Sequence, residues 1–140
     1  KSVYKHIDYG IPVTAANLSK VNNIPTFLVI SAMGADIKSS VFYNKTKGEM
    51  EHDVLQQNIK RTYILRPSLI SGQRNEYRFF EKLGLIIFKI IEPLFIGKLN
   101  QYKIIDAESI AKAMINLANK TSAYQAIISS EDIKQIAKSN

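Results

Sequence analysis

The sequence has no cysteine, only two histidines, and little glycine or proline. Without cysteine, disulfide scaffolds, thiolate zinc sites and cysteine nucleophiles are excluded. His6 and His52 are too few for a zinc site made of imidazoles alone, which takes about three. We therefore expect no metal site. Six glycines and four prolines among 140 residues also exclude a collagen-like or low-complexity chain.

Hydrophobic residues make up 46% of the chain and charged residues 22%, a balance that indicates one globular domain. Nineteen Lys and Arg against twelve Asp and Glu give a net charge of +7, which permits an anionic ligand such as a phosphate-bearing cofactor or a nucleic acid. The basic residues are scattered, so we expect no nucleic-acid partner. The chain opens at Lys1 with no apolar targeting stretch, and we expect a cytoplasmic protein.

One apolar segment, Leu83–Ile96, could be mistaken for a membrane span. It is shorter than the roughly 20 clean apolar residues that a span needs, and it contains Lys89, Glu92 and Pro93. We expect no transmembrane span and interpret the segment as a buried or lid-forming helix. The alternative is a helix that rests on a membrane surface or on a partner subunit, which leaves a homo-oligomer open.

Short apolar runs alternate with longer amphipathic stretches along the chain. Thr26–Ile30 is continuously apolar, which is typical of a parallel strand covered on both faces. Further strands are predicted at Thr62–Leu65 and Gln125–Ser129. Helices are predicted at Val13–Val21, from Ser39 or Ser40 to about Asn58, from Asp106 to about Leu117, and at Glu131–Lys138. This rhythm predicts an α/β fold with a parallel sheet.

Tyr43 and Lys47 are spaced by one helical turn, so both side chains fall on one face of a predicted helix. A nearby cation favours the phenolate and lowers the pKa of a tyrosine. Such a pair can exchange a proton with a substrate hydroxyl or carbonyl near neutral pH. Taken alone, the spacing favours a solvated pair on the helix surface.

Ser31 gives this pair a context. It follows directly on the Thr26–Ile30 strand, and the carboxyl ends of strands are where open α/β sheets bind ligands. Its hydroxyl could donate a hydrogen bond to the carbonyl that Tyr43 protonates. The alternative is that Ser31 only closes a turn before Gly34.

A more specific signal comes from five stretches that follow one another in a fixed order with matching intervals. They are IDY (Ile7–Tyr9), FLVISAMGAD (Phe27–Asp36), FYNKTKGEME (Phe42–Glu51), LRPSLISGQRNEYR (Leu65–Arg78) and DAESIAKAM (Asp106–Met114). Together they resemble the short-chain dehydrogenase/reductases. The most similar branch is the atypical, epimerase-like one of NAD(P)-binding oxidoreductases similar to the Tat-interacting protein.

The resemblance implies a Rossmann-like, doubly wound parallel sheet and a role for each of three side chains. Tyr43 would be the general acid/base. Lys47 would hold the nicotinamide ribose and lower the pKa of Tyr43. Ser31 would orient the substrate carbonyl. Tyr43 and Lys47 would therefore serve both in catalysis and in binding the cofactor.

Pro67, Ser68 and Leu69 match the stretch whose backbone lies beside the nicotinamide amide in the family. A strand that ends at a proline leaves backbone groups free for a ligand, which fits that role. Arg74 and Arg78 match basic positions of the same branch. For these two, a phosphate or carboxylate contact and an ordinary surface ion pair both stay open.

The six glycines form no G-x-G-x-x-G turn, although dinucleotide folds of this kind open with such a turn. We therefore expect residues 1–140 to be the carboxyl-terminal two-thirds of one NAD(P)-binding domain, with its amino-terminal Gly-rich half missing. The substrate-side region would lie at about residues 75–103. Loss of the first strands would leave Phe27–Ile30 along an open sheet edge.

Two functions follow from these patterns. The first is an oxidoreductase or epimerase-like enzyme that uses NAD or NADP on a small-molecule carbonyl or hydroxyl substrate. Ser31, Tyr43 and Lys47 would then transfer the proton that accompanies hydride transfer. The alternative is a non-catalytic NAD(P)-binding regulatory protein that acts through a protein partner.

Overall fold

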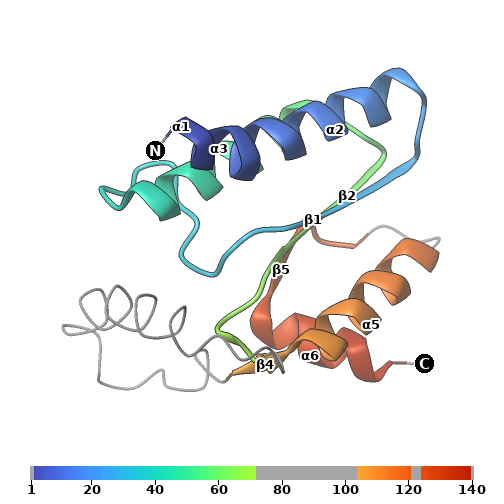
Figure 1. The fold of residues 1–140 in the computed structure, drawn as a ribbon. Helices are drawn as coiled ribbons and strands as arrows, with labels where there is room; N and C mark the ends of the chain where they lie inside the picture. Colours follow the sequence, from blue (N-terminus) through green and yellow to red (C-terminus); the bar gives the residue numbers. More distant parts are fainter. Residues whose placement is uncertain (1, 72–103, 121–123, 140) are drawn as a thin grey trace.

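The computed structural model describes residues 2–71, 104–120 and 124–139 of the chain (Figure 1). The described part is an α/β protein, so this level of the fold prediction is confirmed. Its strands are β1 (Thr26–Ile30), β2 (Arg61–Arg66), β3 (Ile70–Ser71), β4 (Ile105–Asp106) and β5 (Ile127–Ser129). Its helical elements are α1 (Ser2–Lys5), the π-helical turn η1 (His6–Gly10), α2 (Ile11–Val21), α3 (Phe42–Gln56), α5 (Ala107–Asn119) and α6 (Ser130–Lys138).

The main sheet has three strands in the order β1-β2-β5, and both pairings are parallel. Leu28 pairs with Tyr63, and Leu65 pairs with Ile128. The predicted parallel sheet is therefore confirmed for these strands. A separate two-stranded parallel sheet joins β3 to β4, with Ile70 opposite Ile105.

Helices cover both faces of the main sheet, with α1–α3 on one side and α5 and α6 on the other (Figure 1). Successive residues of β2 point to opposite faces, so Ile64 packs with Ala16, Met50 and Val54 of the first layer. The other face is built from Tyr63, Leu65, Ile105, Ile110, Ala113, Leu117, Ile128, Ile133 and Ile136. This two-sided burial explains why the strands read as continuous apolar runs.

The predicted cap of one helix is confirmed, while other helix starts differ from the predictions. Asp106 caps α5, as predicted, and its carboxylate accepts a hydrogen bond from the Ser109 amide at 2.7 Å. α6 begins at Ser130, one residue before the predicted Glu131. The predicted start of α3 at Ser39 or Ser40 is wrong. The Ser39 hydroxyl accepts from the Val41 amide at 3.1 Å, and Phe42 is the first helical residue.

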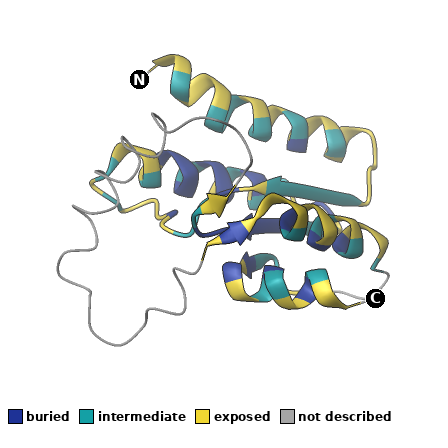
Figure 2. Cartoon of the chain, turned by 60° about the horizontal axis from the view of Figure 1, so that its bottom comes forward, coloured by how far each residue is buried: buried dark blue, intermediate teal, exposed yellow. Residues whose placement is uncertain are grey.

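The helix predicted from Val13 also begins earlier than expected. Turns α1 and η1 continue into α2, so one helical rod runs from Ser2 to Val21. Figure 2 shows that exposed residues follow this rod, while buried residues gather on α3 and in the sheet. No helix in the described ranges has the length and apolar character to cross a membrane. The Leu83–Ile96 segment lies outside those ranges.

β1 pairs with a single strand, β2, within the described sheet. The run at Phe27–Ile30 therefore lies at a sheet edge, as expected. Nothing in the structure shows that strands are missing beyond that edge. Within the described residues this sheet has three strands, which is enough to show an α/β fold. Three strands do not by themselves show a doubly wound, Rossmann-like sheet.

Candidate functional site

Ser31 lies at the carboxyl end of β1 and is 5% exposed. Its amide donates to the Leu65 carbonyl at 2.7 Å, which fixes its backbone to the end of β2. Its hydroxyl has no hydrogen-bond partner among the described residues. The turn that follows is closed through the backbone, because the Ala35 amide donates to the Ala32 carbonyl at 3.0 Å. The Ser31 hydroxyl thus makes no contact that would close the turn.

The loop after Ser31 is held tightly against α3. The Asp36 amide donates to the Asn44 carbonyl at 3.1 Å. At Gly48 the loop backbone comes so close that a Cβ atom would lie 2.3 Å from the Ile37 nitrogen. Only glycine fits such an approach. The sequence between β1 and α3 therefore fixes Ser31 relative to the helix that carries Tyr43 and Lys47.

Tyr43 and Lys47 occupy successive turns of α3 and differ in burial. Tyr43 is 38% exposed, whereas Lys47 is 9% exposed. The Lys47 ammonium forms an ion pair with the Asp8 carboxylate of η1, with 2.7 Å between Nζ and Oδ1. The ring of Tyr43 packs against Tyr4, with centroids 6.0 Å apart. These contacts rule out a solvated pair on the helix surface.

The pKa of Tyr43 shifts in the direction opposite to the one expected from its sequence neighbour. Burial raises the pKa of Tyr43, and the negative charge of Asp8 raises it further. The expected lowering by Lys47 is therefore wrong. The physical reason is that Asp8 sits against the ammonium and offsets its charge. At neutral pH the Tyr43 side chain is a neutral phenol that can donate a proton.

The Pro67–Leu69 stretch comes close to Ser31 but offers fewer free backbone groups than expected. The Pro67 carbonyl accepts from the Met33 amide at 3.2 Å, and the Leu69 carbonyl accepts from the Ile105 amide at 2.9 Å. Ser68 is buried, and its hydroxyl accepts from the Ser130 hydroxyl at 2.9 Å. Each of these two carbonyls therefore already accepts one hydrogen bond, from a neighbouring loop or strand, and keeps one lone pair for a further donor.

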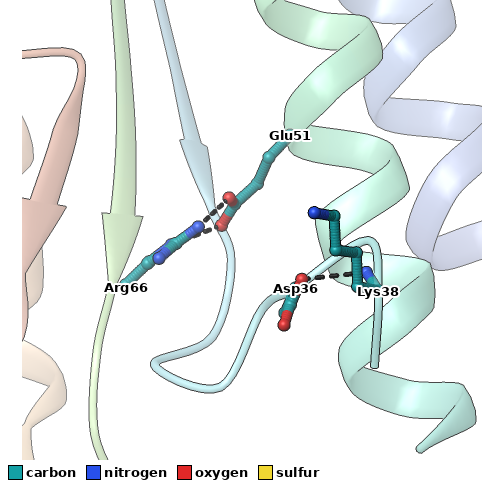
Figure 3. Close-up of polar contacts among 4 residues, drawn as sticks. All are labelled: Asp36, Lys38, Glu51 and Arg66. Carbon is teal, nitrogen blue, oxygen red and sulfur yellow. Dashed lines mark hydrogen bonds and ion pairs between the residues drawn. The ribbon is translucent and has the colours of Figure 1, made fainter. Parts of the chain in front are cut away.

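A buried ion pair fixes the end of β2 just before Pro67. Arg66 donates from Nε to one carboxylate oxygen of Glu51 at 2.9 Å and from Nη2 to the other at 2.5 Å. Glu51 is 4% exposed, and its contact raises the pKa of Arg66. Figure 3 shows Glu51 reaching from α3 to Arg66, past the loop in which Asp36 accepts from the Lys38 amide at 2.8 Å.

Sequence reasoning missed Asp8 and Glu51 as members of this region. Glu51 follows Lys47 by one helical turn, which places it on the same flank of α3 and was a usable signal. Asp8 lies in the IDY stretch, but nothing local indicates that it meets Lys47. Arg74, Arg78 and the region at 75–103 lie outside the described residues. In the parts that are described, no group of three or more His, Asp or Glu side chains could hold a metal ion.

The described part of the chain is an α/β protein with a parallel sheet, in which Ser31 follows the first strand and Tyr43 and Lys47 lie on the next helix, α3. A Candida albicans protein named "Protein FMP52, mitochondrial" is 37% identical over 119 residues, which are 84% of this chain and 51% of that protein. "Protein FMP52-2, mitochondrial" of Scheffersomyces stipitis is 32% identical over 142 residues, 96% of this chain and 61% of that protein. The chain spans about half the length of the curated relatives it matches. No protein-family model matches it.

These names correct two expectations. The relatives are FMP52 proteins, which overturns the identification as a carboxyl-terminal fragment of a Tat-interacting-protein-like short-chain dehydrogenase/reductase. Each of these names also says mitochondrial, which overturns the expected cytoplasmic location. The expectation rested on the lack of an apolar targeting stretch in this sequence. That is weak evidence for the cytoplasm, because mitochondrial targeting segments are amphipathic and contain no long apolar stretch. The names state no reaction.

Proposed function

We propose that this chain belongs to an NAD(P)-dependent oxidoreductase or epimerase-like enzyme with a Rossmann-like sheet. The observation that carries the proposal is the buried, unpartnered hydroxyl of Ser31 at the end of a parallel strand. A buried hydroxyl without a partner costs about 1–3 kcal/mol. The hydroxyls of Tyr4 and Tyr63 are also buried without a partner among the described residues, but only that of Ser31 lies at the carboxyl end of a parallel strand, where open α/β sheets bind ligands. Tyr43 and the buried Lys47 supply the other groups that proton transfer to that ligand needs.

The described residues fit the nicotinamide and ribose end of a dinucleotide. The Ser31 hydroxyl is free to donate, and an ammonium has three donors, so the Asp8 contact leaves Lys47 donors for ribose hydroxyls. The sequence has no G-x-G-x-x-G turn for a pyrophosphate. The cofactor is NAD or NADP, since no residue that reads the ribose 2′ position is identified in the chain.

When bound, the cofactor supplies or accepts the hydride at the substrate carbon. The chain's own residues handle the oxygen of that carbonyl or hydroxyl. Ser31 donates a hydrogen bond to the oxygen and orients it. Tyr43 transfers its phenolic proton to the same oxygen as the carbon gains hydride. The raised pKa of Tyr43 keeps the phenol protonated, and it also makes the phenol a weaker acid than an ordinary tyrosine. Lys47 holds the ribose. The substrate is a small-molecule carbonyl or hydroxyl compound.

Replacing Tyr43 with Phe in the intact protein tests the assignment. We expect Tyr43→Phe to lower turnover by about 10²–10⁴-fold, the range of general acid catalysis, because the phenolic proton is lost. Cofactor binding should change little, since the ring stays. NAD(P)H consumption and NAD(P)H titration measure the two effects. Retained turnover would refute the role of Tyr43.

Tyr124→Phe is the matched control for this experiment. Tyr124 is also partly exposed and also lies beside a lysine, with the Lys120 ammonium 4.4 Å from its ring centroid. It lies far along the chain from Ser31 and Tyr43 and has no role in the proposed chemistry. Turnover should therefore be unchanged in Tyr124→Phe.

The second candidate is a nucleotide-binding regulatory protein without turnover. The observation that favours it is the ion pair, because Asp8 occupies Lys47 and Tyr43 has a raised pKa. This function predicts that the protein binds NAD(P)H but consumes none with any carbonyl compound offered. Substrate-dependent NAD(P)H consumption by the unmodified protein would exclude it.

We also propose that the protein resides in mitochondria, because several relatives carry that word in their names. Fractionation of cells that express the intact, tagged protein measures the location. Recovery of the protein in the cytosolic fraction alone would contradict the proposal.

A further inference from the structure

Asp8 is a charged residue that contacts Lys47 but has no part in the proposed proton transfer. It lies in the π-helical turn η1, where an i→i+5 bond joins the Ile11 amide to the His6 carbonyl. Single π-turns within helices are often found at functional sites. From this turn the Asp8 carboxylate reaches the Lys47 ammonium at 2.7 Å. Lys47 is itself buried, and removing the partner of a buried charge is strongly destabilising.

Contacts on both sides of Asp8 hold its turn against α3. Lys5, one turn earlier, forms an ion pair with Glu49 at 2.8 Å. The next residue, Tyr9, donates its hydroxyl hydrogen bond to Asp53. Two contacts besides the one that Asp8 makes therefore join this turn to α3.

The charge of Asp8 also reaches Tyr43. Asp8 raises the pKa of Tyr43 and of Tyr4, and burial raises both further. The described groups that act on Tyr43 are the ring of Tyr4 from α1, at 6.0 Å between centroids, and the negative charge of Asp8 from η1. One carboxylate thus acts on both side chains that carry the proposed chemistry.

We propose that Asp8 is a positioning residue for the pair Tyr43 and Lys47: its carboxylate anchors the Lys47 ammonium at 2.7 Å, and its negative charge acts on the Tyr43 phenol. The inference rests on the proposed function for its catalytic meaning. The effect of the Asp8 charge on the ionisation of the Tyr43 phenol can be measured without any substrate.

Asp8→Asn in the intact protein tests the proposal, with phenolate absorbance followed as the pH rises. Subtracting the titration of the same protein with Tyr43→Phe added, in each Asp8 background, isolates Tyr43 from the other tyrosines, including Tyr4, on which Asp8 also acts. In the unmodified protein Tyr43 should ionise above the ordinary value of about 10. Without the negative charge, and with Lys47 freed, we expect its titration to move down by about one pH unit. The alkaline limb of turnover should move down by the same amount.

Glu49→Gln is the matched control, because it breaks an ion pair between the same two helices. A role of Asp8 in helix docking alone predicts that both variants lower the melting temperature and that neither moves the Tyr43 titration. An unmoved titration in folded Asp8→Asn would overturn the proposal. Asp8→Glu keeps the charge and should restore most of the original titration.

A second pair of variants covers the case in which Asp8→Asn does not fold. Lys47→Met and Asp8→Asn/Lys47→Met leave no unpaired buried ammonium. The double variant should show the lower Tyr43 titration of the two, since only it lacks the Asp8 charge. Equal titrations would overturn the proposal. A shifted Tyr43 titration in a protein that never consumes NAD(P)H would support the role of Asp8 and count against the proposed enzyme. Failure of the Asp8 proposal can therefore be distinguished from failure of the proposed function.

Discussion

At the scale of single residues, the buried hydroxyl of Ser31 is a cost to stability that the proposed function would explain. Its hydroxyl is buried without a partner among the described residues, while its amide is fully used in the sheet. Tyr43 and Lys47 carry the complementary features, a half-exposed phenol and a buried ammonium. A residue kept at a cost to stability is typical of a binding or catalytic site.

Ser31→Ala should leave the folded protein as stable as before or more stable by about 1 kcal/mol, because the unpaired hydroxyl is removed. Turnover should fall by about 10²-fold, the usual effect of losing one hydrogen bond to the reacting oxygen. Urea denaturation and NAD(P)H consumption of the intact protein measure these effects.

Ser129→Ala supplies the contrast for this prediction. The Ser129 hydroxyl caps α6 by accepting from the Asp132 amide at 3.1 Å. Its loss should cost about 1 kcal/mol of stability and leave turnover unchanged. If Ser31→Ala loses as much stability as Ser129→Ala, the Ser31 hydroxyl has a structural role and our interpretation of it is wrong.

At the scale of elements, the contact between α3 and the loop that follows β1 positions the site. A Cβ atom at position 48 would lie 2.3 Å from the Ile37 nitrogen and 2.4 Å from the Asp36 carbonyl carbon. Both neighbours are backbone atoms and cannot rotate away. Ser31 is the first residue of this loop. The distance between the loop and α3 therefore sets the position of the Ser31 hydroxyl.

Gly48→Ala should therefore destabilise the protein by about 1–3 kcal/mol, the usual cost of overpacking. In an open helix the same change stabilises by up to about 1 kcal/mol. Gly10→Ala is the control, because a Cβ there would make only an ordinary contact, 3.6 Å from His6 Nδ1. Thermal melting of both variants measures the change in stability. A gain in stability for Gly48→Ala would contradict the close contact between the loop and α3.

At the scale of the whole molecule, two apolar features have no cover within the described residues. β1 has one neighbouring strand. The rod formed by α1, η1 and α2 carries apolar side chains that are each more than half exposed, namely Val3, Ile7, Ile11, Leu18 and Val21. An open edge and an apolar helix face both favour association.

These 140 residues, produced alone, should therefore associate in a concentration-dependent way. The replacement of Ile11 and Leu18 by Lys should weaken the association, because it places charge on the apolar face. Light scattering across a range of concentrations measures the size of the particles. A monomer that melts in one sharp transition would contradict this expectation.

Much of the fold could be predicted because its signals are local. The apolar run at Thr26–Ile30 and the cap at Asp106 each lie within a few residues, and the structure has both as expected. The strand β3 has only two residues, Ile70 and Ser71, which is too short to leave a pattern. The start of α3 was misplaced because several residues near it can all cap a helix.

The sequence by itself determined an α/β chain with parallel strands, a tyrosine and lysine on one helix, and a serine at the end of a strand. The roles of Tyr43, Lys47 and Ser31 stay predictions. Only the tertiary structure decided that Asp8 meets Lys47 and that Glu51 meets Arg66. It also reversed the expected pKa shift of Tyr43. The reason is that charge acts through space, and the groups that set these energies are far apart along the chain.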